Sequence, residues 1–254
     1  MSINKDVTIG YPCYDGKCEF LAAQNIFMGM ASPHSVINNV KFLPGDSLVS
    51  RARNKIASAF LSGDTEFLMF IDSDILFDIG HINRLRSLNK GVVGGVYFKK
   101  KIPYEAVANS HIGMEDDLYL MNEIGTGFMM IRRDVFETIR EKHPELAYNK
   151  ENDEADMSAG YFDYFPVGVK DGRYLSEDYY FCHMARECGY KIYYDTNVLV
   201  QHRGTATYPF NDMQFFEASA DLLQKYHTTA PLDKKYLDAI EEGLKHQRTA
   251  RNYE

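Results

Sequence analysis

Phe67-Leu68-Met69-Phe70-Ile71 is a continuous apolar run, and Asp72-Ser73-Asp74 follows it directly. A short run that is apolar on both faces is typical of a central strand in a parallel sheet, because helices cover both sides of such a sheet. Ligands of these sheets bind beyond the carboxyl ends of the strands. The sequence therefore predicts a buried strand that places two carboxylates at the binding edge of a sheet.

Strand-like and helix-like segments alternate around this run. Further strands are predicted at 7–11, 36–43, 91–97, 118–122, 128–131, 191–194 and 198–200. Helices are predicted at 19–30, 49–60, 81–88, 134–143 and 177–187, the second capped by Asp46 or Ser47. This alternation predicts an α/β fold with a mostly parallel central sheet flanked by helices.

The last part of the chain has a different pattern. After Gly204 the apolar spacing becomes helical over 213–226 and 232–245. We therefore expect one catalytic domain at 1–205 and a helical C-terminal extension at 206–254, packed on that domain or on a partner. The polar stretch at 149–159 is expected to be a surface loop.

Composition narrows the class of protein. The 254 residues carry 28 basic and 36 acidic side chains, a net charge of −8, which disfavours binding to nucleic acid. Runs of about 18 apolar residues, the length needed to span a membrane, do not occur in the sequence. The four cysteines form no Cys-x-x-Cys pair, and the N-terminus lacks a signal-like apolar run. These features predict reduced thiols and a cytoplasmic location.

The Asp-Ser-Asp sequence after the central strand points to chemistry with a metal. Two carboxylates one residue apart can both reach a hard divalent cation, and oxygen ligands favour Mg²⁺ or Mn²⁺ over Zn²⁺. Such a cation would bridge to a diphosphate and neutralise its charge. The alternative is that these acidic residues cap the next helix.

Four sequence features, taken in order, resemble nucleotide-sugar-dependent glycosyltransferases of the GT-A fold, closest to the family-2 type. The features are Tyr-Pro-x-Tyr at 11–14 with Ala-Arg-Asn at 52–54, the apolar strand ending in Asp-x-Asp, the Gly-rich segment 125–133, and Ser-Glu-Asp at 176–178. His202, after a late strand, matches the place of a further metal ligand in that family. The resemblance covers roughly residues 5–205 and implies a Rossmann-like GT-A sheet.

The resemblance also implies which residues hold the donor. They are the loop residues Tyr11, Pro12, Tyr14 and Asp15 for the base and ribose, Arg51 and Asn54 on one helix face, Asp72 and Ser73 after the central strand, and Gly125, Thr126 and Gly127. The forked guanidinium of an arginine suits a phosphate. The alternatives are an ordinary Pro-Tyr turn and a solvated helix face.

The implied catalytic pair is Asp178 with Glu177. Asp178 would take the proton of an acceptor hydroxyl, with Glu177 orienting it or binding the acceptor. Alternatively, both carboxylates only favour the helix N-terminus through its dipole. The implied metal ligands for Mn²⁺ or Mg²⁺ are Asp72, Asp74 and His202, and the alternative for His202 is a hydrogen-bonded structural role.

These implications give a specific expected activity. The protein is expected to move a sugar from a nucleoside-diphosphate sugar to a hydroxyl of a glycan or glycoconjugate, with inversion if Asp178 is the base. Uracil is the favoured base, with guanine as the alternative. The competing hypotheses are a sugar-nucleotide nucleotidyltransferase and a non-catalytic carbohydrate-binding protein. The C-terminal helices are expected to serve either homo-oligomer formation or acceptor binding.

Overall fold

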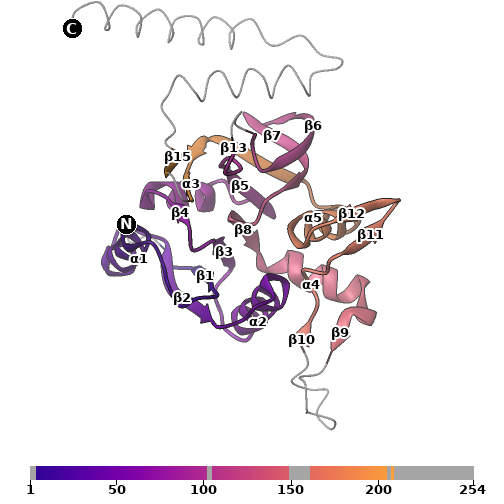
Figure 1. The fold of residues 1–254 in the computed structure, drawn as a ribbon, viewed down its shortest axis with the longest axis horizontal. Helices are drawn as coiled ribbons and strands as arrows, with labels where there is room; N and C mark the ends of the chain where they lie inside the picture. The colour runs from indigo at the N-terminus through magenta and orange to yellow at the C-terminus, as the bar shows by residue number, and fades with distance from the viewer. Residues whose placement is uncertain (1–3, 102–104, 149–160, 205–206, 209–254) are drawn as a thin grey trace, which may run out of the picture.

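The computed structural model describes residues 4–101, 105–148, 161–204 and 207–208. Its centre is an eight-stranded sheet in the order β2-β1-β3-β8-β5-β13-β7-β6 (Figure 1). In chain order its strands are β1 (Val7–Cys13), β2 (Ile37–Pro44), β3 (Phe67–Ile71), β5 (Val92–Val96), β6 (Ala108–Glu115), β7 (Leu118–Ile124), β8 (Phe128–Arg132) and β13 (Ile192–Leu199).

Most strands of this sheet point the same way. β1 is parallel to β2 and β3, and β13 is parallel to β5. β8 is antiparallel to both β3 and β5, and β7 is antiparallel to both β13 and β6. Only β8 and β7 therefore oppose the common direction of the other six. The predicted α/β fold with a mostly parallel, Rossmann-like sheet flanked by helices is confirmed.

Helices cover both faces of the sheet. They are α1 (Phe20–Ala31), α2 (Val49–Leu61), α3 (Ile79–Ser87), α4 (Arg133–Lys142) and α5 (Glu177–Glu187), with a short 3₁₀ turn at Pro144–Leu146. Apolar side chains of α1 and α3 share one core cluster with Phe67, Met69 and Ile71, whereas α2, α4 and α5 share the other with Leu68 and Phe70 (Figure 1). The central strand is thus buried on both faces, as its sequence predicts.

Short strands complete the described part. They are β4 (Ile75–Leu76), β9 (Ala147–Tyr148), β10 (Tyr161–Phe162), β11 (Gly168–Lys170), β12 (Arg173–Leu175), β14 (Gln201–Arg203) and β15 (Thr207–Tyr208). β14 lies between β4 and β15, while β9 pairs with β10 and β11 with β12. β4 and β14 matter for the site, because they join the segment after β3 to the segment that carries His202.

Several local predictions differ from the structure. The two strands expected at 191–194 and 198–200 form one strand, β13, and His202 lies inside β14 instead of after a strand end. The strand β6 was not predicted, because its sequence is largely polar. Its pairing with β7 also shifts register between His111 and Gly113. The expected loop at 149–159 and the expected helices at 213–226 and 232–245 lie outside the described residues.

The strands that share a direction end at one edge of the sheet. The segments that follow them there are Tyr14 after β1, Gly45 to Ser47 after β2, Asp72 to Asp74 after β3, and Tyr97 to Lys100 after β5. This edge is where ligands of such sheets bind. Among the helices in the described ranges, not one is long and apolar enough to cross a membrane.

Candidate functional site

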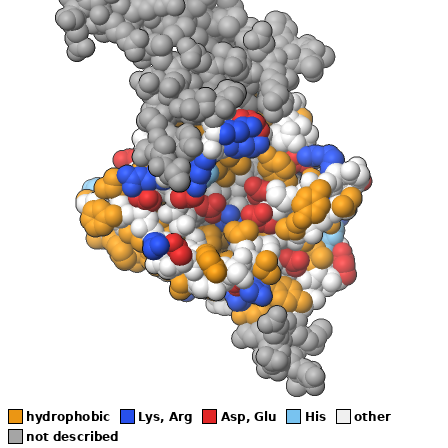
Figure 2. Space-filling view, viewed as in Figure 1, with side chains coloured by type: hydrophobic (Ala, Val, Ile, Leu, Met, Phe, Trp, Pro, Cys, Tyr) orange, Lys and Arg blue, Asp and Glu red, His pale blue; other side chains and the backbone are white. Residues whose placement is uncertain are grey.

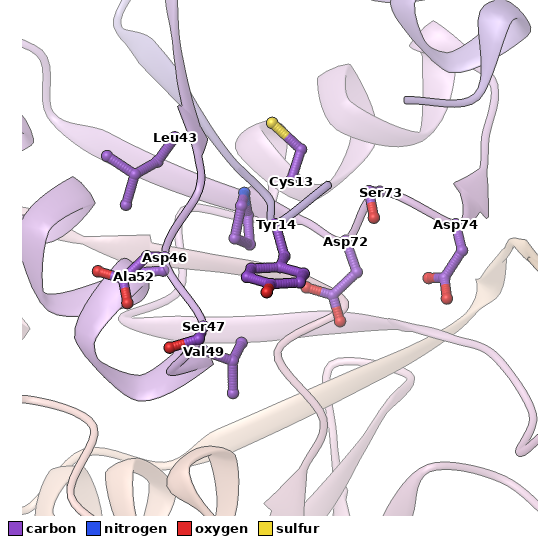
Figure 3. Close-up of a pocket in the computed structure, with 11 residues that line it drawn as sticks. Cys13, Tyr14, Leu43, Asp46, Ser47, Val49, Ala52, Asp72, Ser73 and Asp74 are labelled. Carbon is purple, nitrogen blue, oxygen red and sulfur yellow. The ribbon is translucent and has the colours of Figure 1, made fainter. Parts of the chain in front are cut away.

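The turn after β3 presents two carboxylates at the sheet edge. The Asp72 N–H donates to the Gly127 carbonyl (3.0 Å), and the Ile75 N–H donates to the Asp72 carbonyl (3.0 Å). These bonds close a tight turn, so the side chains of Asp72 and Asp74 point to the same side (Figure 3). Acidic side chains gather near the centre of the face drawn in Figure 2, with basic side chains beside them. The predicted placement of an acidic pair at this edge is confirmed by these contacts.

Asp74 has two basic partners. The Lys100 ammonium contacts Oδ2, and His202 Nε2 lies 3.4 Å from Oδ1. Burial acts to raise the pKa of the Asp74 carboxyl, but the hydrogen bonds and charges of His202 and Lys100 outweigh it and lower that pKa to about 2. Asp74 is therefore ionised at neutral pH and able to bind a cation.

The strand β14 fixes His202 beside Asp74. The Arg203 N–H donates to the Asp74 carbonyl (2.8 Å), and His202 faces Ile75 in the β14–β4 pairing. His202 Nδ1 lies 2.8 Å from the carbonyl oxygen of Phe98, which can only accept a hydrogen bond, so Nδ1 carries the hydrogen. Nε2 is thus directed at Asp74. This is the arrangement in which metal-binding histidines are commonly held.

The predicted metal ligands are not all brought together. In the described ranges, no three His, Cys, Asp or Glu side chains group closely enough to hold a metal ion. Asp74 and His202 are neighbours, but Asp72 Oδ1 accepts a hydrogen bond from Arg53 Nη2 at 2.8 Å. An oxygen and an imidazole nitrogen at this spacing fit two positions around Mn²⁺ or Mg²⁺. Further positions would have to come from water or a ligand.

A buried arginine joins the acidic turn to the second acidic pair. The Arg53 side chain, 2% exposed, donates to Asp72 and lies 3.5 Å from Glu177 Oε1 through Nε. Burial acts to lower the pKa of its guanidinium, but the charges of Asp72 and Glu177 outweigh this and raise it. Within the described part of the chain, Arg53 Nε and Nη1 have no hydrogen-bond partner. The carboxylates of Asp72 and Glu177 therefore belong to one site.

Asp178, the second residue of helix α5, has a different environment. Its Oδ1 accepts hydrogen bonds from the Ser176 hydroxyl and from the Tyr179 N–H (2.8 Å). Burial, followed by the charge of Glu177, raises the pKa of the Asp178 carboxyl to about 6, although Ser176, Tyr179 and Arg53 act to lower it. A carboxyl with a pKa close to neutral can both accept and release a proton near pH 7. This is the property that a general base needs.

The glycine-rich segment 125–127 packs against Asp72 and Tyr97. The Gly127 N–H donates to the Tyr97 hydroxyl at 3.0 Å. A Cβ atom on Gly125 would lie 2.1 Å from that hydroxyl, and one on Gly127 would lie 2.7 Å from it and 3.1 Å from Asp72 Oδ2. Larger residues would therefore displace Tyr97 or Asp72. Thr126 is also buried, so this segment positions Tyr97 and Asp72. The predicted contact of the segment with a ligand stays a prediction.

An open cavity of about 220 Å³ lies beside the acidic turn (Figure 3). It is lined by Pro12, Cys13, Tyr14, Leu43, Asp46, Ser47, Val49, Ala52, Asp72, Ser73 and Asp74. The exposed ring of Tyr14 lies between the Asp46–Ser47 loop and the Asp72 carboxylate in the view of Figure 3. The Gly45 N–H donates to the Tyr14 carbonyl (2.9 Å), which ties the two loops together. The cavity thus offers an aromatic ring next to carboxylates.

The other predicted donor-binding residues are placed differently. Tyr11 is fully buried and donates its hydroxyl to the Ser73 carbonyl (3.2 Å), while Asp15 is exposed and pairs with Lys17 (3.3 Å). Arg51 is bound to the buried Asp46, with Nη2 at 2.9 Å from Oδ1. Tyr11 therefore supports the turn from inside, and Arg51 braces the cavity wall.

The predicted burial of helix α2 is partly wrong. The helical spacing of Val49, Ala52, Ile56, Ala59 and Phe60 predicts a buried apolar stripe with Arg51 and Asn54 nearer the other side of the helix. In the structure, Asn54 is buried and its amide donates to Asp163 (2.7 Å). The Phe165 N–H donates to the Asn54 side-chain oxygen (3.1 Å). These hydrogen bonds compensate for the burial of the Asn54 amide. Asn54 therefore holds the 163–165 segment against helix α2.

Three important residues of the site are not predicted from the sequence. Arg53 lies in the Ala-Arg-Asn motif without a predicted role, and Tyr97 and Lys100 lie outside the predicted site motifs. The rule that found Asp72, that polar residues after a parallel strand face the binding edge, also applies to the segment after β5. That rule could have found Lys100 and Tyr97, whereas no local signal marks Arg53 as a buried residue.

Comparison with known proteins gives only distant likenesses. No protein-family model matches the sequence, and no curated protein matches it significantly. Among solved structures, A197 from STIV is similar with a TM-score of 0.47 and 18% identity over 78% of this chain and 85% of that one. S. aureus TarS 1–349, in complex with UDP-GlcNAc, is similar with a TM-score of 0.39 and 13% identity over 92% of this chain and 70% of that one. Likenesses this distant carry no information on activity.

Proposed function

We propose that this chain is a glycosyltransferase that moves a sugar from a nucleoside-diphosphate sugar to an acceptor hydroxyl with inversion. The observation that carries the proposal is Arg53, which contacts Asp72 at 2.8 Å and Glu177 at 3.5 Å. It places the acidic turn after β3 and the Glu177–Asp178 pair in one site. Sugar transfer needs both parts, because one end must hold a charged leaving group and the other must remove a proton.

In the proposed reaction, Asp178 acts as the general base. Asp178 accepts the proton of the acceptor hydroxyl while the oxygen forms a bond to the anomeric carbon. The bond from that carbon to the diphosphate oxygen breaks, and its electron pair leaves with the nucleoside diphosphate. The pKa of Asp178 near 6 leaves most of the carboxylate free to accept the proton at pH 7. One displacement of this kind inverts the anomeric centre.

Asp74 and His202 are the residues that would hold Mn²⁺ or Mg²⁺ in this proposal. When bound, the cation would stabilise the negative charge that grows on the leaving diphosphate. Two observations support this role: the low pKa of Asp74 keeps its carboxylate ionised, and the contact of His202 Nδ1 with the Phe98 carbonyl directs Nε2 at Asp74. Asp72, held by Arg53, orients the turn that carries Asp74.

The cavity beside Tyr14 is proposed to hold the base and ribose of the donor. It adjoins Asp72, Ser73 and Asp74, so a nucleotide lying in it would direct its diphosphate to the acidic turn. The chain has no Trp, so stacking on the base falls to Tyr14, whose ring is 66% exposed. The family resemblance of the sequence favours uracil, and therefore a UDP-sugar.

Product identification tests this proposal. The protein is incubated with Mn²⁺ or Mg²⁺, a set of nucleotide sugars and a glycan acceptor, and the released phosphate species is identified. We expect a nucleoside diphosphate with at least one donor, and far slower release after Asp178→Asn. Release of pyrophosphate would instead indicate a nucleotidyltransferase. Binding of nucleotide sugars without any release would indicate a carbohydrate-binding protein that does not turn over.

A further inference from the structure

Three consecutive lysines follow β5, and they have different partners. Lys99 and Lys101 both contact Glu105, whereas Lys100 turns away from them and contacts Asp74. The pairing of its two neighbours neutralises part of the local charge. Lys100 is therefore the lysine of this segment that is directed into the acidic turn.

Backbone contacts between residues 97–99 and 105–107 hold the start of the lysine segment in place. The Lys99 N–H donates to the Glu105 carbonyl (2.8 Å), and the Val107 N–H donates to the Tyr97 carbonyl (3.0 Å). Phe98 and Ala106 form an antiparallel bridge between them. These bonds place Lys100 at the carboxyl edge of β5, which is separated in the sheet from β3 by β8 alone. The position of Lys100 thus follows from the sheet.

Stability of the fold does not explain this position. The side chains of Lys100 and Asp74 are 35% and 37% exposed, and an ion pair with that much exposure contributes little to stability. Asp74 also has a second partner in His202. An ammonium on a flexible four-carbon side chain is, by contrast, well suited to binding a phosphate group as a point charge.

We propose that Lys100 binds the diphosphate of the donor, and that Asp74 holds its ammonium until the donor arrives. This inference rests on the proposed function, because it assigns Lys100 to the leaving group of that reaction. Binding of the donor exchanges the carboxylate partner of Lys100 for a diphosphate oxygen. The same exchange frees Asp74 Oδ2. Lys100 and a divalent cation are thus competitors for Asp74 and partners once a diphosphate is bound.

This double role gives effects of opposite sign. Removing the ammonium with Lys100→Gln leaves Asp74 open to a cation, so Mn²⁺ alone is expected to bind severalfold more tightly. Pyrophosphate and UDP, added with saturating Mn²⁺, are expected to bind about tenfold or more weakly, because a charge-assisted hydrogen bond is lost. Titration calorimetry measures both affinities on the full chain. Lys100→Arg should keep most of the pyrophosphate affinity.

Lys101→Gln is the matched control, because it removes the same charge from the same segment but faces Glu105. We expect it to change neither affinity by more than about twofold. Lys100→Gln that keeps the wild-type pyrophosphate affinity, or binds Mn²⁺ no more tightly, would overturn the assignment of Lys100. A third outcome is that Lys100→Gln weakens pyrophosphate binding as expected, but the wild-type protein transfers no sugar. That result would contradict the proposed function and leave the assignment of Lys100 standing.

Discussion

Asp74 and Asp178 are two partly buried carboxyls of one site with opposite behaviour. Burial acts to raise the pKa of both side chains. At Asp74 the hydrogen bonds and charge interactions of His202 and Lys100 outweigh burial and bring the pKa to about 2. At Asp178 the charge of Glu177 adds to the effect of burial, and together they bring the pKa to about 6.

This difference in pKa matches the two roles in the proposed function, binding at Asp74 and proton transfer at Asp178. A carboxyl that is ionised at every working pH suits a permanent cation site, while one that titrates near neutrality suits a base. Arg53 connects the two ends, since it contacts Asp72 beside Asp74 and Glu177 beside Asp178.

Removing Arg53 should have the largest effect on the fold. Arg53→Met takes a buried charge from between two carboxylates, and breaking such a buried pair typically costs about 3–5 kcal/mol in the free energy of unfolding. Urea unfolding at pH 7 measures the loss. Arg51→Met is the control, because Arg51 is more exposed and its partner Asp46 keeps Lys55. A loss for Arg53→Met no greater than that for Arg51→Met would contradict the linking role.

Replacing Asp178 or Asp74 with asparagine should change the free energy of unfolding at pH 7 in opposite directions. The folded pKa of Asp178, about 6, exceeds its ordinary value of 3.8, so its contribution is fully present below about pH 4 and is lost as the pH rises through 6. Asp178→Asn, which cannot ionise, should therefore stabilise the protein by about 1–3 kcal/mol at pH 7. This gain should disappear near pH 4.

Asp74→Asn should have the opposite sign. The folded pKa of Asp74 is lowered, so its contribution is present above about pH 4 and is lost as the pH falls through 2. Because the pair is more than a third exposed, we expect a loss of about 1 kcal/mol or less at pH 7. Urea midpoints of both variants at pH 7 and pH 4 make the comparison. Equal signs at pH 7 would refute the contrast between the two carboxyls.

The smallest effect should be a shift in the pH profile. We expect kcat/KM to rise with pH as Asp178 loses its proton, with the midpoint near pH 6. Glu177→Gln removes a like charge and should lower that midpoint by up to about one unit. Glu187→Gln on the same helix, whose partners are Lys170 and His183, should leave it in place. A midpoint that rises or stays fixed in Glu177→Gln would place the base elsewhere.

The sequence predicts the features that depend on local pattern. The strand at 67–71 and the helix at 177–187 have the predicted bounds, because a two-faced apolar run and a Ser-Glu-Asp start are local signals. Asp72, Asp74 and Asp178 follow from the same signals together with the family resemblance. The roles of these residues depend on their neighbours, which local pattern does not determine.

The missed residues depend on the order of strands in the sheet. Lys100 meets Asp74 because β8 is inserted antiparallel between β3 and β5, an order that adjacent sequence does not reveal. Arg53 is buried because Asp72 and Glu177, distant from it in sequence, compensate its charge. Helical spacing alone predicts Asn54 on the less buried side of α2, and its hydrogen bond to Asp163 reverses that.

The most direct test compares Asp178→Asn with Asp74→Asn in donor binding and turnover, with Mn²⁺ present. Asp178→Asn should bind UDP within about twofold of wild type, while its turnover falls by a factor of about 10² to 10⁴, the usual contribution of a general base. Asp74→Asn should lose about tenfold or more in UDP affinity, because the cation site loses its charged ligand. Normal turnover by Asp178→Asn, or unchanged UDP affinity in Asp74→Asn, would contradict the division of the site into a binding end and a proton-transfer end.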